Sequence, residues 1–202
     1  MKKSILNTKK LVVLAVLSAL GSVLMVFEIP FIPPLKIDIS DVTVTVAGII
    51  YGPFGAVVVA AIKSLVHIFV TPDDFGVGEF IAFVASMCYV LPFLFTVKLS
   101  KKVFTNQYLI RIVPGIVATI SLTVLITIFN IAVSFQLYSF VMTNKFLSYN
   151  TVVAMAISFI PGNLIKGAVI SVIFLILSFR LDYVVEKLKI YDEDKSQFPF
   201  NK

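Results

Sequence analysis

The chain has 202 residues, of which 59% are hydrophobic and 14% are charged, with a formal net charge of +6. A soluble domain would be nearer half apolar, so this composition indicates an integral membrane protein, embedded in a lipid bilayer as one compact bundle. The basic residues flank apolar segments and form no groove or stripe, which argues against nucleic acid as a partner. The single cysteine, Cys88, excludes a disulfide framework within the chain.

Six apolar segments follow one another along the chain. A membrane-spanning helix needs about 20 apolar residues, and the second segment is short. The segments cover residues 11–27, 42–51, 56–70, 78–99, 109–135 and 152–179. The second and third form either one long kinked span or a hairpin closed by Gly52-Pro53-Phe54-Gly55. We favour the hairpin, because a turn rich in glycine and proline between two apolar runs costs little.

Charged residues are distributed unevenly between alternate connections. If the N-terminus lies inside, the inner connections hold most lysines and arginines, whereas the outer ones hold only Lys36 and Lys145 as bases. The acids of the outer connections are Glu28, Asp38, Asp41, Asp73, Asp74 and Glu79. The positive-inside rule therefore favours six spans with both termini cytoplasmic. We expect an all-α polytopic membrane protein, with a six-helix transmembrane domain at residues 1–183 and a short polar cytoplasmic tail at 184–202.

Three polar side chains, Asn130, Asn163 and Lys166, interrupt the last two spans near their outer ends. An amide or an ammonium in lipid costs several kcal/mol unless it has a partner. Asn163 and Lys166 share one helix face, and the antiparallel course of the two spans puts Asn130 at a similar depth. Two amides and an unpaired lysine suit a flat heterocycle edged with carbonyls and ring nitrogens. Helix–helix hydrogen bonding is the alternative; we favour the ligand site.

Other candidate site residues lie in the outer connections and nearby helix ends. Residues 33–41 alternate polar and apolar after two prolines, which suits a lid over a cavity. The candidate substrate-binding or lid residues are Leu35, Lys36, Asp38, Ser40, Thr43, Glu79 and Phe83. Lys63 and His67, four residues apart, either line the same cavity or anchor a helix end near Asp73 and Asp74.

No motif for catalysis accompanies these residues. The chain has a single histidine, His67, which rules out a multi-histidine metal site. It has no nucleophile elbow, phosphate-binding loop or paired carboxylates within the spans. We therefore expect no catalytic residues, no metal and no cofactor. Uphill transport would draw its energy from a partner or from an ion gradient.

The chain resembles the substrate-binding membrane subunit, the S component, of an energy-coupling-factor vitamin transporter, and within that family the riboflavin-specific type. The resemblance runs from residue 11 to about residue 183. The matching pieces are Ala15-x-x-x-Ala19, Leu35-Lys-Ile-Asp-Ile-Ser-Asp41, Tyr51-Gly-Pro-Phe-Gly55, Val77-Gly-Glu79 and Pro161-Gly-Asn-Leu-Ile-Lys166. The family's first helix carries three small residues at four-residue spacing, and the third position here is Val23.

The resemblance implies a six-helix bundle in the bacterial plasma membrane with an outward-facing pocket. It implies that Asn130, Asn163 and Lys166 bind the isoalloxazine edge of riboflavin beneath the lid at 35–41. It also implies a coupling transmembrane subunit docked on Ala15 and Ala19 and two cytoplasmic ATPase subunits, with transport by toppling of the S component in the membrane. An S component for thiamine or pantothenate, and a stand-alone small-solute facilitator, remain alternatives.

Overall fold

The structure is a computed structural model that describes residues 8–32, 35–70 and 75–187, with side chains described in these ranges except at 29–37 and 182–187. The elements in chain order are α1 (Thr8–Val26), β1 (Ile29–Ile32), β2 (Leu35–Ile37), α2 (Asp41–Val70), α3 (Val77–Val103), α4 (Gln107–Phe129), the π-helical turn η1 (Asn130–Ser134), α5 (Phe135–Thr143), α6 (Tyr149–Ser158) and α7 (Ile160–Lys187). Five stretches of the described chain are long and apolar enough to cross a membrane. The expectation of a helical, polytopic membrane protein is confirmed at this level. The structure also contains an antiparallel strand pair, β1–β2, in a segment where the sequence predicts a loop.

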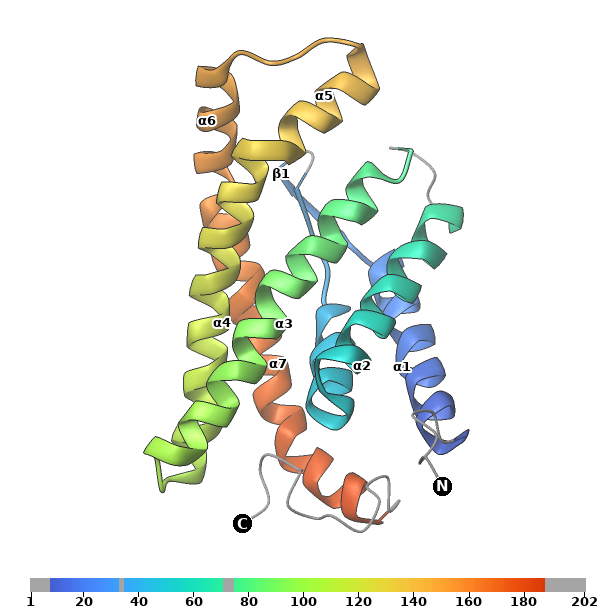
Figure 1. Ribbon diagram of the computed structural model, residues 1–202, viewed down its shortest axis with the longest axis vertical. Helices are drawn as coiled ribbons and strands as arrows, with labels where there is room; N and C mark the ends of the chain where they lie inside the picture. Colours follow the sequence, from blue (N-terminus) through green and yellow to red (C-terminus); the bar gives the residue numbers. More distant parts are fainter. Residues whose placement is uncertain (1–7, 33–34, 71–74, 188–202) are drawn as a thin grey trace, which may run out of the picture.

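Helix α2 folds back on itself at Gly52. The backbone there is not helical, with φ 76° and ψ −170°, a conformation that glycine adopts without a Cβ penalty. In a continuous helix Asp41 and Lys63 would lie about 33 Å apart, yet their side chains form an ion pair. The two arms of α2 are therefore antiparallel neighbours, as Figure 1 also shows. The hairpin prediction is confirmed.

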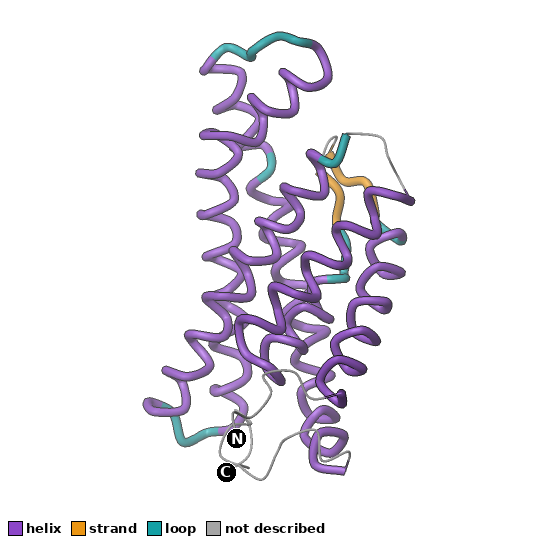
Figure 2. The backbone as a smooth tube through the Cα atoms, turned by 45° about the vertical axis from the view of Figure 1, so that its right-hand side comes forward, coloured by secondary structure: helices purple, strands orange, loops and turns teal. Residues whose placement is uncertain are grey.

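The helices alternate in direction through the bundle. Helix α1 packs on α2, α3 packs between α2 and α4, and α7 packs on α4. The start of α1, the α3–α4 turn and the end of α7 lie at one end of the molecule, whereas β1–β2 and the α5–α6 connection lie toward the other (Figure 1). We call these the lower and the upper end. The α5–α6 hairpin extends beyond the rest of the bundle at the upper end (Figure 2).

The last two apolar segments, expected to be continuous, are each interrupted. Helix α4 passes through the π-turn η1, in which the Phe135 amide donates to the Asn130 carbonyl. Helices α6 and α7 are separated at Phe159, two residues before Pro161, which has no amide to donate. The breaks adjoin Asn130 and Asn163. Both predicted amide residues therefore sit where the helices change geometry, as is frequent at functional sites.

Helices α4 and α7 approach each other closely below these breaks. A Cβ placed on Gly167 would lie 2.8 Å from Thr119 Cγ2 and 3.0 Å from Thr119 Cα, so only glycine fits there. The Ser171 hydroxyl donates to the Gly115 carbonyl at 3.1 Å across the same interface. Small residues at such contacts are typical of helix packing in membranes. The contact fixes the spacing of the two helices that carry Asn130, Asn163 and Lys166.

Candidate substrate-binding site

A cavity opens in the upper half of the bundle, between α1, α2, α3, η1, α5 and α7. It contains about 910 Å³ of empty space, counting its open mouth. Its apolar lining comes mainly from Met25, Ile81, Ala82, Ala85, Ile126, Phe135 and Phe159. Its polar lining consists of Glu28, Asp38, His67, Glu79, Asn130, Ser134, Tyr138, Asn163 and Lys166. A partly apolar cavity with a few placed polar groups is the usual form of a small-molecule site.

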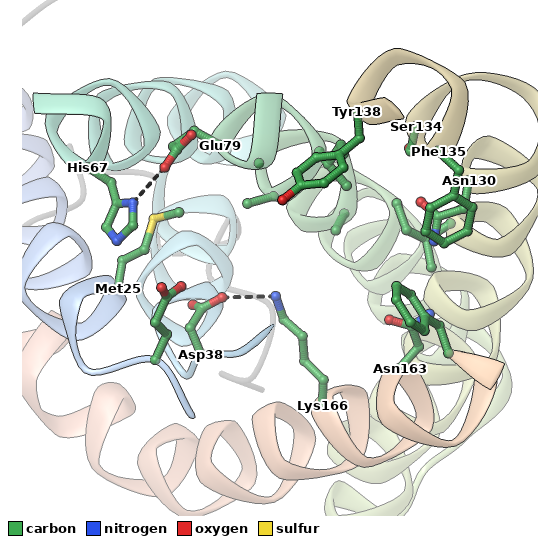
Figure 3. Close-up of a pocket in the computed structure, with 17 residues that line it drawn as sticks. Met25, Asp38, His67, Glu79, Asn130, Ser134, Phe135, Tyr138, Asn163 and Lys166 are labelled. Carbon is green, nitrogen blue, oxygen red and sulfur yellow. Dashed lines mark hydrogen bonds and ion pairs between the residues drawn. The ribbon is translucent and has the colours of Figure 1, made fainter. Parts of the chain in front are cut away.

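One side of the cavity presents amide and hydroxyl groups. Asn130, Ser134 and Asn163 are buried and line this side, which we call the amide side (Figure 3). Asn163 Nδ2 and Ser134 Oγ have no hydrogen-bond partner among the described residues. Buried polar groups are nearly always hydrogen-bonded, so two unpartnered groups facing one cavity need an explanation. A bound molecule with polar edges would provide their partners.

Lys166 projects between the amide side and the opposite wall, but it is not unpaired as the sequence analysis expected. Its Nζ lies 3.0 Å from Asp38 Oδ2 and 3.1 Å from Asp41 Oδ2. Asp38, in the connection before α2, and Asp41, the first residue of α2, are themselves buried. A buried charge requires an opposite charge nearby. For Asp38 this partner is Lys166, which is 128 residues away along the chain, so local sequence pattern does not reveal the pair.

A second lysine completes this cluster of charges. Lys63 is fully buried, and its Nζ donates to Asp41 Oδ1 and, at 2.6 Å, to Ser40 Oγ. Ser86 Oγ also donates to Asp41. Burial would raise the pKa of Asp38, but Lys166, Lys63 and the Ser40 hydroxyl hold it well below its usual range. We call Asp38, Asp41, Lys63 and Lys166 the charge cluster; it contains two negative and two positive charges.

The wall opposite the amide side carries a histidine–carboxylate pair. His67 Nδ1 lies 2.9 Å from Glu79 Oε1, and both residues are buried and line the cavity (Figure 3). Glu79 Oε2 has no hydrogen-bond partner among the described residues. Glu28, two residues after the end of α1, lines the same cavity. We call this wall the acidic side; it offers acceptors to a ligand that carries hydroxyl groups.

The other candidate residues differ in whether they line the cavity. Ser40 and Thr43 are buried beside the cavity, where Thr43 Oγ1 donates to the Ser40 carbonyl at 2.8 Å. Phe83 packs against the hydrophobic core instead of lining the cavity. Lys63 lies behind the cavity, whereas His67 lines it. The side chains of Leu35 and Lys36, and residues Asp73 and Asp74, lie outside the described part of the chain.

Sequence reasoning missed the aromatic lining, which consists of Phe135, Tyr138 and Phe159. Phe135 packs edge-to-face on Phe159 with ring centroids 5.2 Å apart. Each of these rings lies within eight residues of Asn130 or Asn163 along the chain. That proximity to the predicted polar residues was the available signal.

The face of α1 predicted to dock a partner points outward. Ala15 and Ala19 are both exposed. The large apolar residues Leu11, Val12, Val16, Leu20 and Val23 on the same helix are also exposed. The face is therefore open to lipid or to another membrane helix, and the docking role stays a prediction.

The fold and the cavity define a polytopic membrane protein that can enclose a small polar-edged molecule near one end of its bundle. Comparison with known proteins gives the family. Residues 9–178 match the family described as ECF transporter, substrate-specific component, and the chain belongs to this family.

Individual relatives agree with this assignment. The chain is 33% identical to the riboflavin transporter FmnP of Bacillus subtilis (strain 168), over 90% of this chain and 96% of that protein. It is 32% identical to the riboflavin transporter RibU of Staphylococcus aureus (strain TCH60), over 93% of this chain and 97% of that protein. A solved structure described as "Structure and mechanism of the S component of a bacterial ECF transporter" superposes with a TM-score of 0.67 and 32% identity, covering 89% of this chain and 98% of that one.

Proposed function

We propose that this chain is the riboflavin-binding membrane subunit of an ATP-driven energy-coupling-factor importer and takes the vitamin from outside the cell toward the cytoplasm. The observation that carries the proposal is the cavity in which Asn163 Nδ2 and Ser134 Oγ are buried on the amide side without a partner in the described part of the chain. Family membership and the relatives described as riboflavin transporters support the choice of vitamin.

The two sides of the cavity match the two parts of riboflavin. The isoalloxazine ring is flat and largely apolar, with carbonyls and ring nitrogens along one edge, and it carries a polyol chain. Asn130 and Asn163 present amide donors and acceptors that suit the ring edge, and the aromatic lining suits the ring faces. Glu79 and His67 on the acidic side suit the hydroxyl groups of the chain. Lys166, between the two sides, donates to a ring carbonyl while it keeps its contacts with Asp38 and Asp41.

The charge cluster favours a neutral vitamin over an anionic one. Pantothenate would use Lys166 and Lys63 as its counter-charges. In the structure both lysines are already matched by Asp38 and Asp41. An added carboxylate would therefore meet a neutral cluster and, across the cavity, the further acids Glu28 and Glu79. Discrimination against anions follows from like-charge repulsion in a site of low dielectric.

Under this proposal the cavity faces the outside of the cell. Lys98, Lys101 and Lys102 lie near the lower end of α3, at the end of the bundle where α1 begins and α7 finishes (Figure 1). The positive-inside rule puts this end in the cytoplasm. With the two arms of α2 counted separately, six helical segments then alternate across the membrane, both ends of the chain are cytoplasmic and the cavity faces outward.

The energy source lies in partner subunits under this proposal. Helix α1 offers Ala15 and Ala19 on an exposed face to a coupling transmembrane subunit, and two cytoplasmic ATPase subunits hydrolyse ATP. The chain itself is a transport subunit without enzymatic activity. Release of riboflavin to the cytoplasm follows when the whole subunit topples in the membrane.

Uptake of radiolabelled riboflavin tests the proposal against the facilitator alternative. The chain is expressed in bacteria that lack riboflavin uptake, either alone or with the coupling subunit and both ATPases of its own source organism. We expect uptake only with all partners present, and its loss when the ATPases are inactivated by mutation. Uptake by the chain alone would identify a stand-alone facilitator, and absence of uptake in both cases would contradict the assigned substrate.

A further inference from the structure

The charge cluster contains a lysine, Lys63, that does not reach the cavity and yet affects the electrostatics of one that does, Lys166. Lys166 and Asp38 line the cavity, whereas Lys63 and Asp41 lie behind them. Lys63 is 0% exposed, and its Nζ contacts Asp41 and Ser40. A fully buried lysine is rare unless it is paired with an opposite charge. Its position therefore calls for a role tied to Asp41.

Asp41 is shared between the two lysines through different oxygen atoms. Its Oδ1 accepts from Lys63, and its Oδ2 lies 3.1 Å from Lys166 Nζ. Lys166 has a second carboxylate contact, with Asp38 at 3.0 Å. An ammonium group has three donors. One of them is donated to Asp38 Oδ2, and Asp41 holds the ammonium by an ion pair, which leaves donor capacity for a molecule in the cavity.

Lys63 determines how strongly Lys166 is held back from that cavity. With Lys63 present the cluster is neutral, because its two lysines balance its two carboxylates. Without it, Asp38 and Asp41 would share Lys166 alone, and the cluster would carry one uncompensated negative charge. In a buried site such a charge is poorly screened, so it would draw Lys166 Nζ toward Asp41 and away from a ligand carbonyl.

We propose that Lys63 is a positioning residue for substrate binding: it neutralises Asp41 and thereby leaves one donor of Lys166 available to the substrate. The inference rests on the proposed function, in which Lys166 donates to a ring carbonyl of riboflavin. It assigns to Lys63 a role in affinity although the residue does not line the cavity. It also makes a prediction about charge balance that a packing role for Lys63 would not make.

The test compares Lys63→Met with the charge-balanced double variant Lys63→Met/Asp41→Asn. Each is purified as the full chain in mild detergent, and riboflavin binding is measured by fluorescence quenching together with the thermal unfolding midpoint. Lys98→Met, an exposed lysine at the lower end of α3, is the matched control. We expect Lys63→Met to weaken binding by about tenfold or more, and the double variant to return to within about threefold of the unmodified chain.

The visible absorption band of bound riboflavin gives a second readout, because it responds to hydrogen bonding at the ring carbonyls. We expect the band to change in Lys63→Met and to recover in the double variant. Unchanged binding in Lys63→Met, or a double variant that binds as weakly as the single one, would overturn the inference. If Lys63→Met does not fold, the double variant alone decides by the same threefold limit. Failure of the unmodified chain to bind riboflavin would instead refute the proposed function.

Discussion

Asn163 permits a prediction in which stability and affinity change in opposite directions. Its side chain is 3% exposed, and its Nδ2 has no hydrogen-bond partner among the described residues. A buried donor without a partner costs about 1–3 kcal/mol. Asn163→Leu replaces the amide by an apolar group of similar size and removes this cost from the empty protein. We expect the variant without ligand to be more stable by about 1 kcal/mol, which for a chain of this length is a rise of roughly 2–4 °C in unfolding temperature.

The same variant should bind riboflavin less well. It loses the hydrogen bond to the ring edge and leaves the ligand's own polar atom buried without a partner. The expected loss is about 1–3 kcal/mol, which corresponds to about a five- to 150-fold increase in Kd. Thermal unfolding of the empty protein and fluorescence titration with riboflavin measure the two effects on one preparation.

Thr127→Val is the matched control for this variant. Thr127 Oγ1 is also buried without a hydrogen-bond partner among the described residues, but Thr127 does not line the cavity. We expect it to stabilise the empty protein and leave the riboflavin affinity unchanged. The reasoning would be refuted if Asn163→Leu destabilised the empty protein and bound riboflavin normally, since the Asn163 amide would then act within the protein.

Three further predictions concern other parts of the molecule. Glu79→Gln should weaken riboflavin binding by about ten- to 150-fold through loss of a charged hydrogen-bond acceptor. The affinity of this variant for lumiflavin, which lacks the polyol chain, should stay within about twofold of that of the unmodified protein. An equal loss for both ligands would contradict contact between Glu79 and the polyol. Asp38 has a pKa below its ordinary value of 3.8 in the folded protein, so its contribution to stability is present above pH 3.8 and is lost as the pH falls below that value. The thermal unfolding temperature of the purified chain should therefore fall on acidification, and Asp38→Asn should reduce this pH dependence. Gly167→Ala places a methyl group 2.8 Å from Thr119 Cγ2 and should destabilise the chain by about 1–3 kcal/mol; an unchanged unfolding temperature would show that α4 and α7 can separate at no cost.

The sequence was sufficient for features that depend on local pattern. The hairpin at Gly52 follows from a glycine and a proline between two apolar runs, and the structure has it. The similar depth of Asn130, Asn163 and Lys166 follows from their positions in two antiparallel spans, and all three line one cavity. Polar residues in apolar segments are rare enough that each one is informative by itself.

The features that were missed depend on contacts between distant segments. From the sequence alone Asp38 and Asp41 are acidic residues of a connection, and nothing near them in the chain indicates that Lys63 and Lys166 are their partners. The pair of His67 and Glu79 joins two helices across a connection, and a list of candidate residues does not reveal it. The π-turn at Asn130 is one extra residue in a helical turn, and the apolar pattern around it is compatible with a regular helix.

The first experiment should be the visible absorption and fluorescence spectrum of the chain purified in mild detergent from cells grown in rich medium. The account predicts a yellow protein with a flavin spectrum that is released on denaturation, or an empty protein that quenches the fluorescence of added riboflavin at a one-to-one ratio. A colourless protein that leaves riboflavin fluorescence unchanged would contradict the flavin assignment, while membership of the transporter family would stand and the vitamin would have to be sought by competition binding.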